Sequence, residues 1–415
     1  MPNATNPAAE DAGRRAGTLA ANTVDSLPEG ALSDKLSLAE QEGRGLRVKL
    51  GIDPTAPDIH LGHAVVLRKL REFQDAGHRV VLIVGDYTAR VGDPSGRSSL
   101  RPILSEEEID ANAATFQEQA VKILDPDPEQ LEVRRNSEWL DMPMTDLFGL
   151  LRTTTAAQLL ERDDFAKRWS AKEPISMLEL LYPLLQGYDS VAVRADVEVG
   201  GTDQKFNLLL GRDVQRAHHQ PAQAILTMPI LVGTDGTRKM SKSLGNQIGI
   251  TDSPQEMYGK TMAIPDELIS EYRRLLLGSG EAVTPADGSP AGEPSELSPR
   301  DAKRALARDL VAWLHSPEDA VSAERHFDRV FVEHEDPETI EEATFASDGG
   351  MVHLPGLMAE EFGISRSQAR RLIDEGGVRL GETQLANGEH DIPGERADGK
   401  VLKVGKRRFR RLREV

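Results

Sequence analysis

The chain has 415 residues, of which 39% are hydrophobic and 28% charged, and its formal net charge is −18. This length is enough for two or three domains with a sizeable core. The sequence contains no cysteine, which excludes disulfides and thiolate metal sites and fits a cytoplasmic location. No apolar run approaches the roughly 18 residues of a membrane helix, and the N-terminus lacks the apolar core of a signal peptide. We therefore expect a cytoplasmic protein without a membrane partner.

The charge is distributed unevenly along the chain. Residues 351–415 contain 13 basic and 10 acidic residues, a net charge of +3, so the remaining chain has a net charge of −21. The last segment, KVGKRRFRRLREV, holds seven basic residues and one acidic residue. The acidic body argues against nonspecific coating of nucleic acid. A basic end on an acidic body predicts a localised partner site instead, with RNA as the candidate partner.

Residues 1–30 are expected to form a flexible tail, and short apolar runs then alternate with helical patterns up to about residue 250. The expected strands cover residues 47–53, 79–86 and 223–233, and an amphipathic helix covers residues 61–77. This alternation predicts an α/β fold with a doubly wound, Rossmann-like sheet in a domain spanning residues 31–253. Residues 95–195 carry several further helical patterns and are expected to form an insertion in that domain.

The rest of the chain predicts two smaller parts. Residues 254–345 are dominated by helical patterns and are expected to form an α-helical domain. A segment rich in glycine, proline, serine and acidic residues, at 279–300, is expected to be flexible. Residues 351–415 predict a small α+β domain, with two helices at 354–363 and 365–377 followed by strands.

The segment GIDPTAPDIHLGH follows the first expected strand and opens the first long helix. The N-terminus of a helix offers free backbone N–H groups and the positive end of a dipole, which favour phosphate. His60 and His63 stand at this place, where two imidazoles can donate hydrogen bonds to phosphate oxygens. Gly51 and Gly62 leave room for a nucleotide against the backbone. Taken alone, the pattern also fits two surface histidines or a metal-binding pair.

A second motif, KMSKS at residues 239–243, places two lysines three residues apart. The two motifs in this order resemble the signatures of the class I aminoacyl-tRNA synthetases, HIGH after the first strand and KMSKS after the last. Here the first motif reads HLGH, and the second is complete. The resemblance covers about residues 45–260. Gly233, Gly236 and Gly245 are interpreted as hinges that let this loop close over ATP.

The stretch YPLLQGYD places Tyr182, Gln186 and Asp189 on one helix face, because they lie four and three residues apart. From the pattern alone, this polar trio is either a solvent-facing stripe or the wall of a small pocket. It resembles bacterial-type tyrosyl-tRNA synthetases, in which the matching tyrosine and glutamine bind the α-amino group of the substrate and the aspartate accepts from its phenol. In GDPSGR, Asp93 matches a residue that also holds the amino group. In VGGTDQKFN, Gln204 lies on a loop that contacts the ribose and the substrate carboxylate in that family.

The same resemblance implies the other site residues. Those implied for the ATP phosphates and the departing pyrophosphate are His60, His63, Lys239, Lys242, Thr55, Arg97 and Arg101. Those implied for the rest of ATP are Gly51, Asp53, Gly62, Gly201, Asp203 and Ser243. ATP is implied with Mg²⁺, and no dedicated metal site is expected because the sequence shows no cluster of metal ligands.

Lys49 departs from the family pattern. Many bacterial members have a tyrosine at this position, two residues before the glycine of GIDPT, where it contacts the phenol. A lysine there can donate to the phenolic oxygen, pair with Asp189 or point away from the pocket, and it needs a partner if it is buried. The KMSKS motif, where bacterial tyrosyl enzymes often have KFGKS or KFGKT, and the GGTDQKFN segment also differ from the commonest bacterial wording. Together these differences predict a divergent bacterial branch.

The segment SRSQARRLIDEGGVRLGE resembles the S4 RNA-binding domain, although a solvated basic face also fits the pattern. The residues that the resemblance implies for tRNA are Arg366, Arg370, Arg371 and Arg379. Residues 254–345 resemble the anticodon-binding domain of the family more loosely. Family members are homodimers that pair through the insertion. The apolar segments 147–160 and 175–185 fit such an interface, and they fit core helices equally well.

The resemblance implies activation of L-tyrosine by ATP and transfer of the tyrosyl group to tRNA-Tyr. Two alternative functions are weighed against this one. A tryptophanyl-tRNA synthetase shares the fold, but the YPLLQGYD pattern and the S4-like tail argue against it. A non-catalytic RNA-binding homologue would not need both signature motifs, which are present here.

Overall fold

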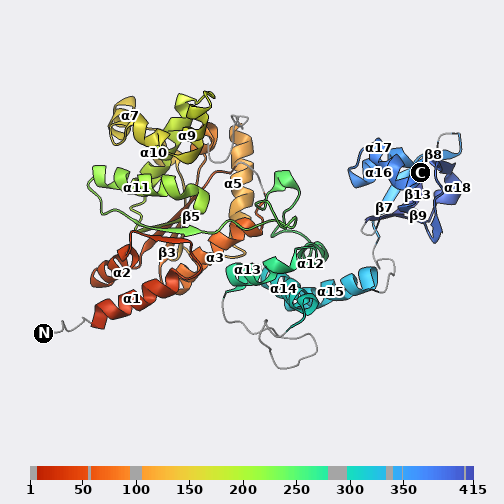
Figure 1. Cartoon of the computed structure of the whole chain (residues 1–415), viewed down its shortest axis with the longest axis horizontal. Coiled ribbons are helices and arrows are strands. Elements are labelled where there is room, and N and C mark those ends of the chain that lie inside the picture. Colours follow the sequence, from red (N-terminus) through yellow and green to blue (C-terminus); the bar gives the residue numbers. More distant parts are fainter. Residues whose placement is uncertain are drawn as a thin grey trace. The chain divides into compact units, whose positions relative to one another are not determined.

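The computed structural model describes residues 7–54, 58–93, 105–278, 297–332, 340–347, 349–405 and 408–415. The chain divides into two compact units, Met1–Ala323 and Glu324–Val415. Each unit has its own sheet (Figure 1). Within the described residues, no helix is both long enough and apolar enough to cross a membrane.

The first unit is built on a six-stranded sheet in the order β1-β6-β5-β2-β3-β4. The strands are β1 (Asp25–Leu27), β2 (Arg47–Ile52), β3 (Arg79–Val84), β4 (Leu131–Arg135), β5 (Val197–Gly201) and β6 (Ala224–Met228). Only β1 runs antiparallel to its neighbour. The chain proceeds from β2 outward through β3 to β4, and then resumes on the other side of β2 with β5. Adjacent parallel strands that continue in opposite directions create a switch point, where ligands of α/β proteins bind at the carboxyl ends of the strands.

Helices cover both faces of this sheet. The long ones are α3 (Leu61–Asp75), α5 (Glu106–Ala120), α10 (Met177–Ala192) and α11 (Lys205–Ala217). Figure 1 shows α3 on one face and α10 and α11 on the other. Because both faces are covered, the central strands are buried and read as continuous apolar runs, as in RVVLIV of β3. The predicted doubly wound α/β fold is therefore confirmed.

The prediction of a flexible tail over residues 1–30 was wrong for residues 7–27. Helix α1 (Pro7–Leu19) and strand β1 belong to the first unit, and β1 pairs with β6. The ammonium of Lys69, on α3, donates to the backbone carbonyls of Leu19 at 3.1 Å and Ala21 at 2.7 Å. Helix α2 (Ala31–Gln41) follows. The sequence concealed this docking because α1 is short of large apolar residues and is held partly by polar contacts.

The expected insertion at residues 95–195 was also partly wrong, because it contains a strand of the main sheet. Strand β4 pairs in parallel with β3, with Val80 opposite Leu131. Its sequence, LEVRR, is largely polar because β4 is an edge strand, and most of its side chains are only half-buried. The helical insertion begins after β4. It consists of α6 (Ser137–Leu140), α7 (Met144–Leu151), α8 (Ala156–Leu160) and α9 (Asp163–Ser170), which lead to α10.

The helical region after the sheet belongs largely to the first unit. Its main helices are α12 (Pro254–Met262), α13 (Ile269–Tyr272), α14 (Pro299–Leu314) and α15 (Pro317–Phe327). Tyr258 and Tyr272 are fully buried in this region. The boundary between the units falls after Ala323, within α15, rather than at 345–351. Most of the segment that was expected to be flexible, residues 279–296, lies outside the described residues.

The second unit is a small α+β fold, as predicted. Helices α16 (Leu354–Phe362) and α17 (Arg366–Asp374) pack on a five-stranded sheet in the order β10-β9-β12-β13-β7. These strands are β7 (Glu342–Phe345), β9 (Val378–Leu380), β10 (Thr383–Gln384), β12 (Val401–Val404) and β13 (Arg408–Glu414). A separate pair joins β8 (Met351–His353) to β11 (Asp391–Pro393), next to α18 (Gly394–Ala397). Leu354, Met358, Ile373, Leu402 and Leu412 are fully buried in its core.

Candidate active site

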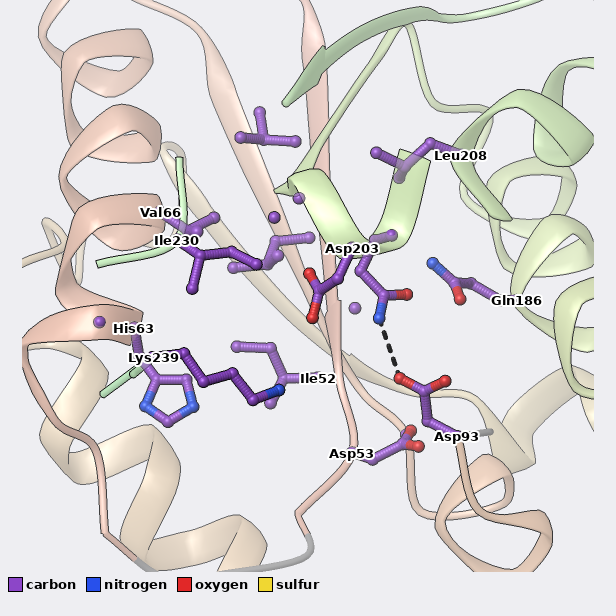
Figure 2. A pocket seen from close by; sticks show the side chains of 18 of the residues that line it. Ile52, Asp53, His63, Val66, Asp93, Gln186, Asp203, Leu208, Ile230 and Lys239 are labelled. Atoms are coloured by element: carbon purple, nitrogen blue, oxygen red, sulfur yellow. Dashed lines mark hydrogen bonds between the residues drawn. The ribbon is translucent and has the colours of Figure 1, made fainter. Parts of the chain in front are cut away.

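A cleft of about 720 Å³ opens at the switch point of the first sheet. The carboxyl ends of β2 and β5, the start of α3, and residues 229–231 and 239–243 line it. Figure 2 shows its side chains converging from these elements. The predicted site residues that line it are Gly51, Asp53, His60, Gly62, His63, Asp93, Tyr182, Gln186, Asp189, Gly201, Asp203, Gln204, Lys239, Lys242 and Ser243. Thr55, Arg97 and Arg101 lie outside the described residues.

His60 and His63 form the start of α3 as well as one wall of the cleft. Gly62 N–H donates to Nδ1 of His60 at 3.2 Å, and His60 N–H donates to Nδ1 of His63 at 3.3 Å. A neutral imidazole carries its proton on one nitrogen, so both rings have Nε2–H left to donate. Burial, the neighbouring His63 and Lys239 lower the pKa of His60 to about 3, and burial lowers that of His63 to about 4. Both rings are therefore neutral donors at pH 7.

Backbone hydrogen bonds join the start of α3 to the segment that follows KMSKS, although the two are far apart in the sequence. Leu61 N–H donates to the carbonyl of Ile248 at 2.9 Å, and Ile250 N–H donates to that of Ile59 at 3.0 Å. His60 and Gly249 form an antiparallel bridge between these bonds. The segment after KMSKS is thus paired with the start of α3. This pairing holds the lysines of the motif near the histidines.

Asn246 shapes the KMSKS loop from inside. Its side chain is 3% exposed, its Oδ1 accepts from Ser241 N–H at 2.8 Å, and its Nδ2 donates to the carbonyl of Lys239 at 3.1 Å. Gly233 has to be glycine here, because a Cβ would lie 2.3 Å from Cγ of Asn246. Gly236 and Gly245 have φ of +76° and +64°. Each of these three glycines has a structural reason to be glycine, independent of the proposed hinge role.

The two lysines of the motif are placed differently. Figure 2 shows Lys239 extending from beside His63 into the space that faces Asp203. Burial raises the pKa of Asp203, and the charge of Lys239 partly offsets that rise. The exposed Lys242 forms an ion pair with Asp58, which belongs to the segment before HLGH. Two ammonium groups and two neutral imidazoles therefore line the same end of the cleft.

Tyr182, on α10, is bound to a carboxylate that was assigned to the nucleotide. Its hydroxyl donates to Oδ2 of Asp53 at 2.9 Å, and Oδ1 of the same group accepts from the Thr88 hydroxyl at 2.6 Å. Burial and the charge of Asp53 raise the pKa of Tyr182 well above its usual value. Asp53, which was assigned to the nucleotide, and Tyr182, which was assigned to the amino acid, are therefore joined directly by a hydrogen bond.

The other polar side chains that were assigned to the amino acid are connected by hydrogen bonds. Nε2 of Gln204 donates to Oδ2 of Asp93 at 2.9 Å, the dashed contact in Figure 2. Nδ2 of the buried Asn207 donates to Oε1 of both Gln186, at 2.8 Å, and Gln204, at 3.1 Å. Asn207 in turn accepts from the guanidinium of Arg162 at 3.0 Å. The two glutamines are thus held by residues that the sequence pattern did not identify.

Asp189 is a buried carboxylate at the inner wall of the cleft, with 3% exposure. Its Oδ1 accepts from the indole N–H of Trp139 at 2.8 Å, and its Oδ2 accepts from Nδ2 of Asn136 at 3.5 Å. Burial raises the pKa of Asp189 to about 7, and the charge of Lys49 and these two hydrogen bonds limit the rise. A carboxylate that accepts two such bonds keeps room for a further donor.

Lys49 was predicted among the tyrosine-binding residues, and the structure corrects this. It is fully buried and does not line the cleft. Its ammonium lies 2.8 Å from Oε1 of Glu198 and donates to the carbonyl of Gln186 at 3.0 Å. Of the three possibilities considered, pairing with Asp189 is not seen: the partner of Lys49 is Glu198, which itself lines the cleft. The sequence did not reveal Glu198 because VEVGG reads as an ordinary strand.

The arginines implied for RNA lie in the second unit. Arg366, Arg370 and Arg371 are on α17 and Arg379 is on β9, and all four are exposed. The described residues contain no group of three or more His, Cys, Asp or Glu side chains arranged to hold a metal ion.

Comparisons with known proteins identify the family. The model of the family described as tRNA synthetases class I (W and Y) matches residues 41–332. A protein named Tyrosine--tRNA ligase from Moorella thermoacetica is 49% identical over 407 residues, covering 97% of this chain and 96% of that protein. One of the same name from Thermotoga maritima is 49% identical over 394 residues, covering 94% and 95%. A crystal structure described as tyrosyl-tRNA synthetase complexed with L-tyrosine, from Archaeoglobus fulgidus, has a TM-score of 0.60 at 25% identity and covers 75% of this chain and 99% of that one. The chain therefore belongs to the family of class I tRNA synthetases (W and Y).

Proposed function

We propose that this chain is a tyrosine--tRNA ligase, which activates L-tyrosine with ATP and transfers the tyrosyl group to tRNA-Tyr. One arrangement carries the proposal. A single cleft has neutral imidazoles and ammonium groups at one end and the buried carboxylate of Asp189 at the other. Relatives named Tyrosine--tRNA ligase match nearly the whole chain, which favours tyrosine over tryptophan.

In the first step, the carboxylate of tyrosine attacks the α-phosphorus of ATP, and pyrophosphate leaves. This displacement needs no protein nucleophile, so the protein contributes positioning and charge stabilisation. His60 and His63 donate Nε2–H to phosphate oxygens. Lys239 and Lys242 neutralise the charge that develops on the pyrophosphate. Lys242 must first leave Asp58, its partner in this structure.

Mg²⁺ accompanies ATP in this proposal. Asp203 and Asp53 are single carboxylates in the cleft, and Asp53 already accepts from Tyr182 and Thr88. Oxygen ligands from the phosphates would therefore supply most of the coordination, as is usual for Mg²⁺ with nucleotides. When bound, the ion would supply further positive charge to the phosphates, to which Lys239 and Lys242 also contribute.

At the other end, Asp189 accepts a hydrogen bond from the phenol of tyrosine. A site built to hydrogen-bond a hydroxyl rejects phenylalanine, because the buried polar group of the site would be left without that partner. Tyrosyl enzymes, which discriminate against phenylalanine by about 10⁵-fold, are the known example. Asp93 and Gln186 face the α-amino group, together with Tyr182 at the edge of the pocket. Gln204, which donates to Asp93, also lines this part of the cleft.

The second step requires tRNA. In this proposal, the exposed arginines of α17 and β9 contact its phosphates. A protein that uses ATP and tRNA would act in the cytoplasm. A variant that lacks residues 340–415 should keep tyrosine-dependent pyrophosphate exchange and lose most tRNA charging. Loss of both activities would contradict the RNA-binding role of the second unit.

A homodimer is part of the proposal. Large apolar side chains of the insertion and of the start of α10 are exposed: Met144 by 61%, Phe148 by 52%, Trp169 by 66% and Met177 by 74%. Figure 1 shows α7, α9 and α10 in the same part of the first unit. An exposed apolar patch of this kind fits a subunit interface. Sedimentation of a Phe148→Asp, Met177→Asp variant should show monomers, and an unchanged dimer would place the interface elsewhere.

The decisive experiment is ATP–pyrophosphate exchange with each of the 20 amino acids in turn. Exchange with tyrosine alone supports the proposal, exchange with tryptophan would make the chain a tryptophan enzyme, and no exchange would favour a non-catalytic RNA-binding homologue. Asp189→Ala should weaken exchange with tyrosine much more than exchange with phenylalanine. Equal losses for the two amino acids would refute the role given to Asp189.

A further inference from the structure

The first observation is the complete set of partners around the buried Lys49. Its ammonium has three hydrogens and three acceptors: the Gln186 carbonyl at 3.0 Å, the Ser190 hydroxyl at 2.8 Å and Oε1 of Glu198 at 2.8 Å. A charged ammonium without water persists only when its donors are satisfied and an opposite charge is near. Both conditions are met, so Lys49 is held as a fixed positive charge beneath α10.

The second observation is that Glu198 is saturated in the same way. It is 1% exposed, and its Oε2 accepts from the Ser190 hydroxyl at 3.1 Å and from the side-chain amide of Gln223. Ser190 links the two charges, because its hydroxyl accepts from Lys49 and donates to Glu198. The pair therefore ties β2 and β5, on either side of the switch point, to one turn of α10.

The third observation is what this turn carries. Gln186 and Asp189 both line the cleft from this turn, and Ser190 follows directly. The charge of Lys49 lowers the pKa of Asp189, and that of Glu198 raises it. The neutral groups that bond the same carboxylate are Trp139 and Asn136. The other ionisable side chain of α10 in the cleft is Tyr182, whose pKa the charge of Asp189 helps to raise.

We propose that Lys49 and Glu198 are positioning residues for amino-acid selection: the buried pair holds the turn of α10 that carries Gln186 and Asp189, and it sets the charge of Asp189. This inference rests on the proposed function, in which Asp189 accepts from the phenol. An ionised carboxylate is the stronger acceptor for a neutral hydroxyl. Lys49 favours the ionised form, and Glu198 opposes it. In this chain, therefore, the residue at position 49 does not contact the phenol itself, as the family tyrosine does. It acts instead on Asp189, the group that accepts from the phenol.

The test compares Lys49→Met, Glu198→Gln and the double variant by pyrophosphate exchange across pH. In the wild type, kcat/KM for tyrosine should fall as the pH drops through about 7, because Asp189 becomes protonated. Removing the positive charge should move the midpoint up. A rise of about one pH unit from 7 would lower kcat/KM at pH 7 about fivefold, because the ionised fraction of Asp189 would fall from about a half to about a tenth. Glu198→Gln should move the midpoint down. The double variant loses both charges, and its midpoint should return toward that of the wild type.

Lys69→Met is the matched control. Lys69 is another buried lysine, with 1% exposure, and it donates to two backbone carbonyls and to Glu72 outside the cleft. It should lose stability without moving the midpoint. Phenylalanine provides a second readout, because it has no hydroxyl for Asp189. Its kcat/KM should not fall as the pH drops through 7 in any of these proteins.

Several outcomes separate the inference from its alternatives. Shifts in the same direction for both single variants, or no shift in either, would show a structural role only and overturn it. The double variant keeps the test informative if Lys49→Met fails to fold, because it leaves no unpaired buried charge. It must then give a midpoint above that of Glu198→Gln, and a midpoint equal to it would refute the inference. Absence of tyrosine exchange in the wild type would contradict the proposed function itself, which is a different result.

Discussion

Asn246→Ala is expected to disorganise the KMSKS loop while leaving the tyrosine end of the cleft intact. The change removes the acceptor of Ser241 N–H and the donor to the carbonyl of Lys239, at 2.8 and 3.1 Å. A backbone group left without its partner costs about 1–3 kcal/mol. Because water can reach this loop, we take about 1 kcal/mol for each group and about 2 kcal/mol in total. That corresponds to about a 30-fold loss in kcat/KM for ATP.

The assay is pyrophosphate exchange at varied ATP, with tyrosine affinity measured separately by equilibrium dialysis. Gln247→Ala is the matched control, because Gln247 is the next residue and its Oε1 has no hydrogen-bond partner in the described part of the chain. It should leave kcat/KM for ATP unchanged. Gly233→Ala should reproduce the defect, since its Cβ would displace Asn246. The reasoning is refuted if Asn246→Ala leaves kcat/KM for ATP intact, or if it weakens tyrosine binding by the same factor.

Three further outcomes are expected. The free energy of unfolding should fall between pH 6.5 and 4, because His60 and His63 stay neutral in the folded protein but take up protons when it unfolds. At pH 5 the loss is up to about 2 kcal/mol per histidine. In a His60→Asn, His63→Asn variant, the unfolding free energy measured with urea should depend less steeply on pH. Asp58→Asn should lower KM for ATP in pyrophosphate exchange by about threefold, because it frees Lys242 from an exposed ion pair. Arg370→Gln should weaken tRNA binding in filter assays, reduce the salt slope by about 1, and leave pyrophosphate exchange unchanged.

Each of these expectations has a contrary result. An unfolding free energy that is flat from pH 6.5 to 4 would mean that the two histidines are already charged in the folded protein. A rise in KM for ATP after Asp58→Asn would make Asp58 a contributor to ATP binding rather than a competitor for Lys242. An unaltered salt slope in the Arg370→Gln variant would remove this arginine from the RNA contacts.

Sequence patterns located the parts of the site that depend on local structure. HLGH stands at a helix start because its two imidazoles cap that helix, and this can be inferred from a strand followed by an amphipathic pattern. Tyr182, Gln186 and Asp189 share a helix face because of their spacing, and all three line the cleft. Strand β4 and the docked N-terminal segment were missed, since edge strands and polar contacts leave no continuous apolar run.

Other parts of the site depend on contacts between distant segments. Asn207, Asn136 and Trp139 are hydrogen-bonded to site residues, and Arg162 forms an ion pair with Asp93, yet none of the four belongs to a recognisable motif. Each of these residues contacts a site residue that lies far from it in the sequence. Such second partners can be found only when the elements are packed together.

The sequence by itself determined the α/β class, the two signature motifs and the face of α10 that lines the cleft, because periodicity and capping act within a few residues. The tertiary structure alone decided where Lys49 points. A buried ammonium takes whichever carboxylate the packing brings within reach, and here β5 brings Glu198 to 2.8 Å. The same packing aligns HLGH with the segment after KMSKS. These pairings depend on the order of strands in the sheet, which places β5 beside β2 and which no local pattern encodes.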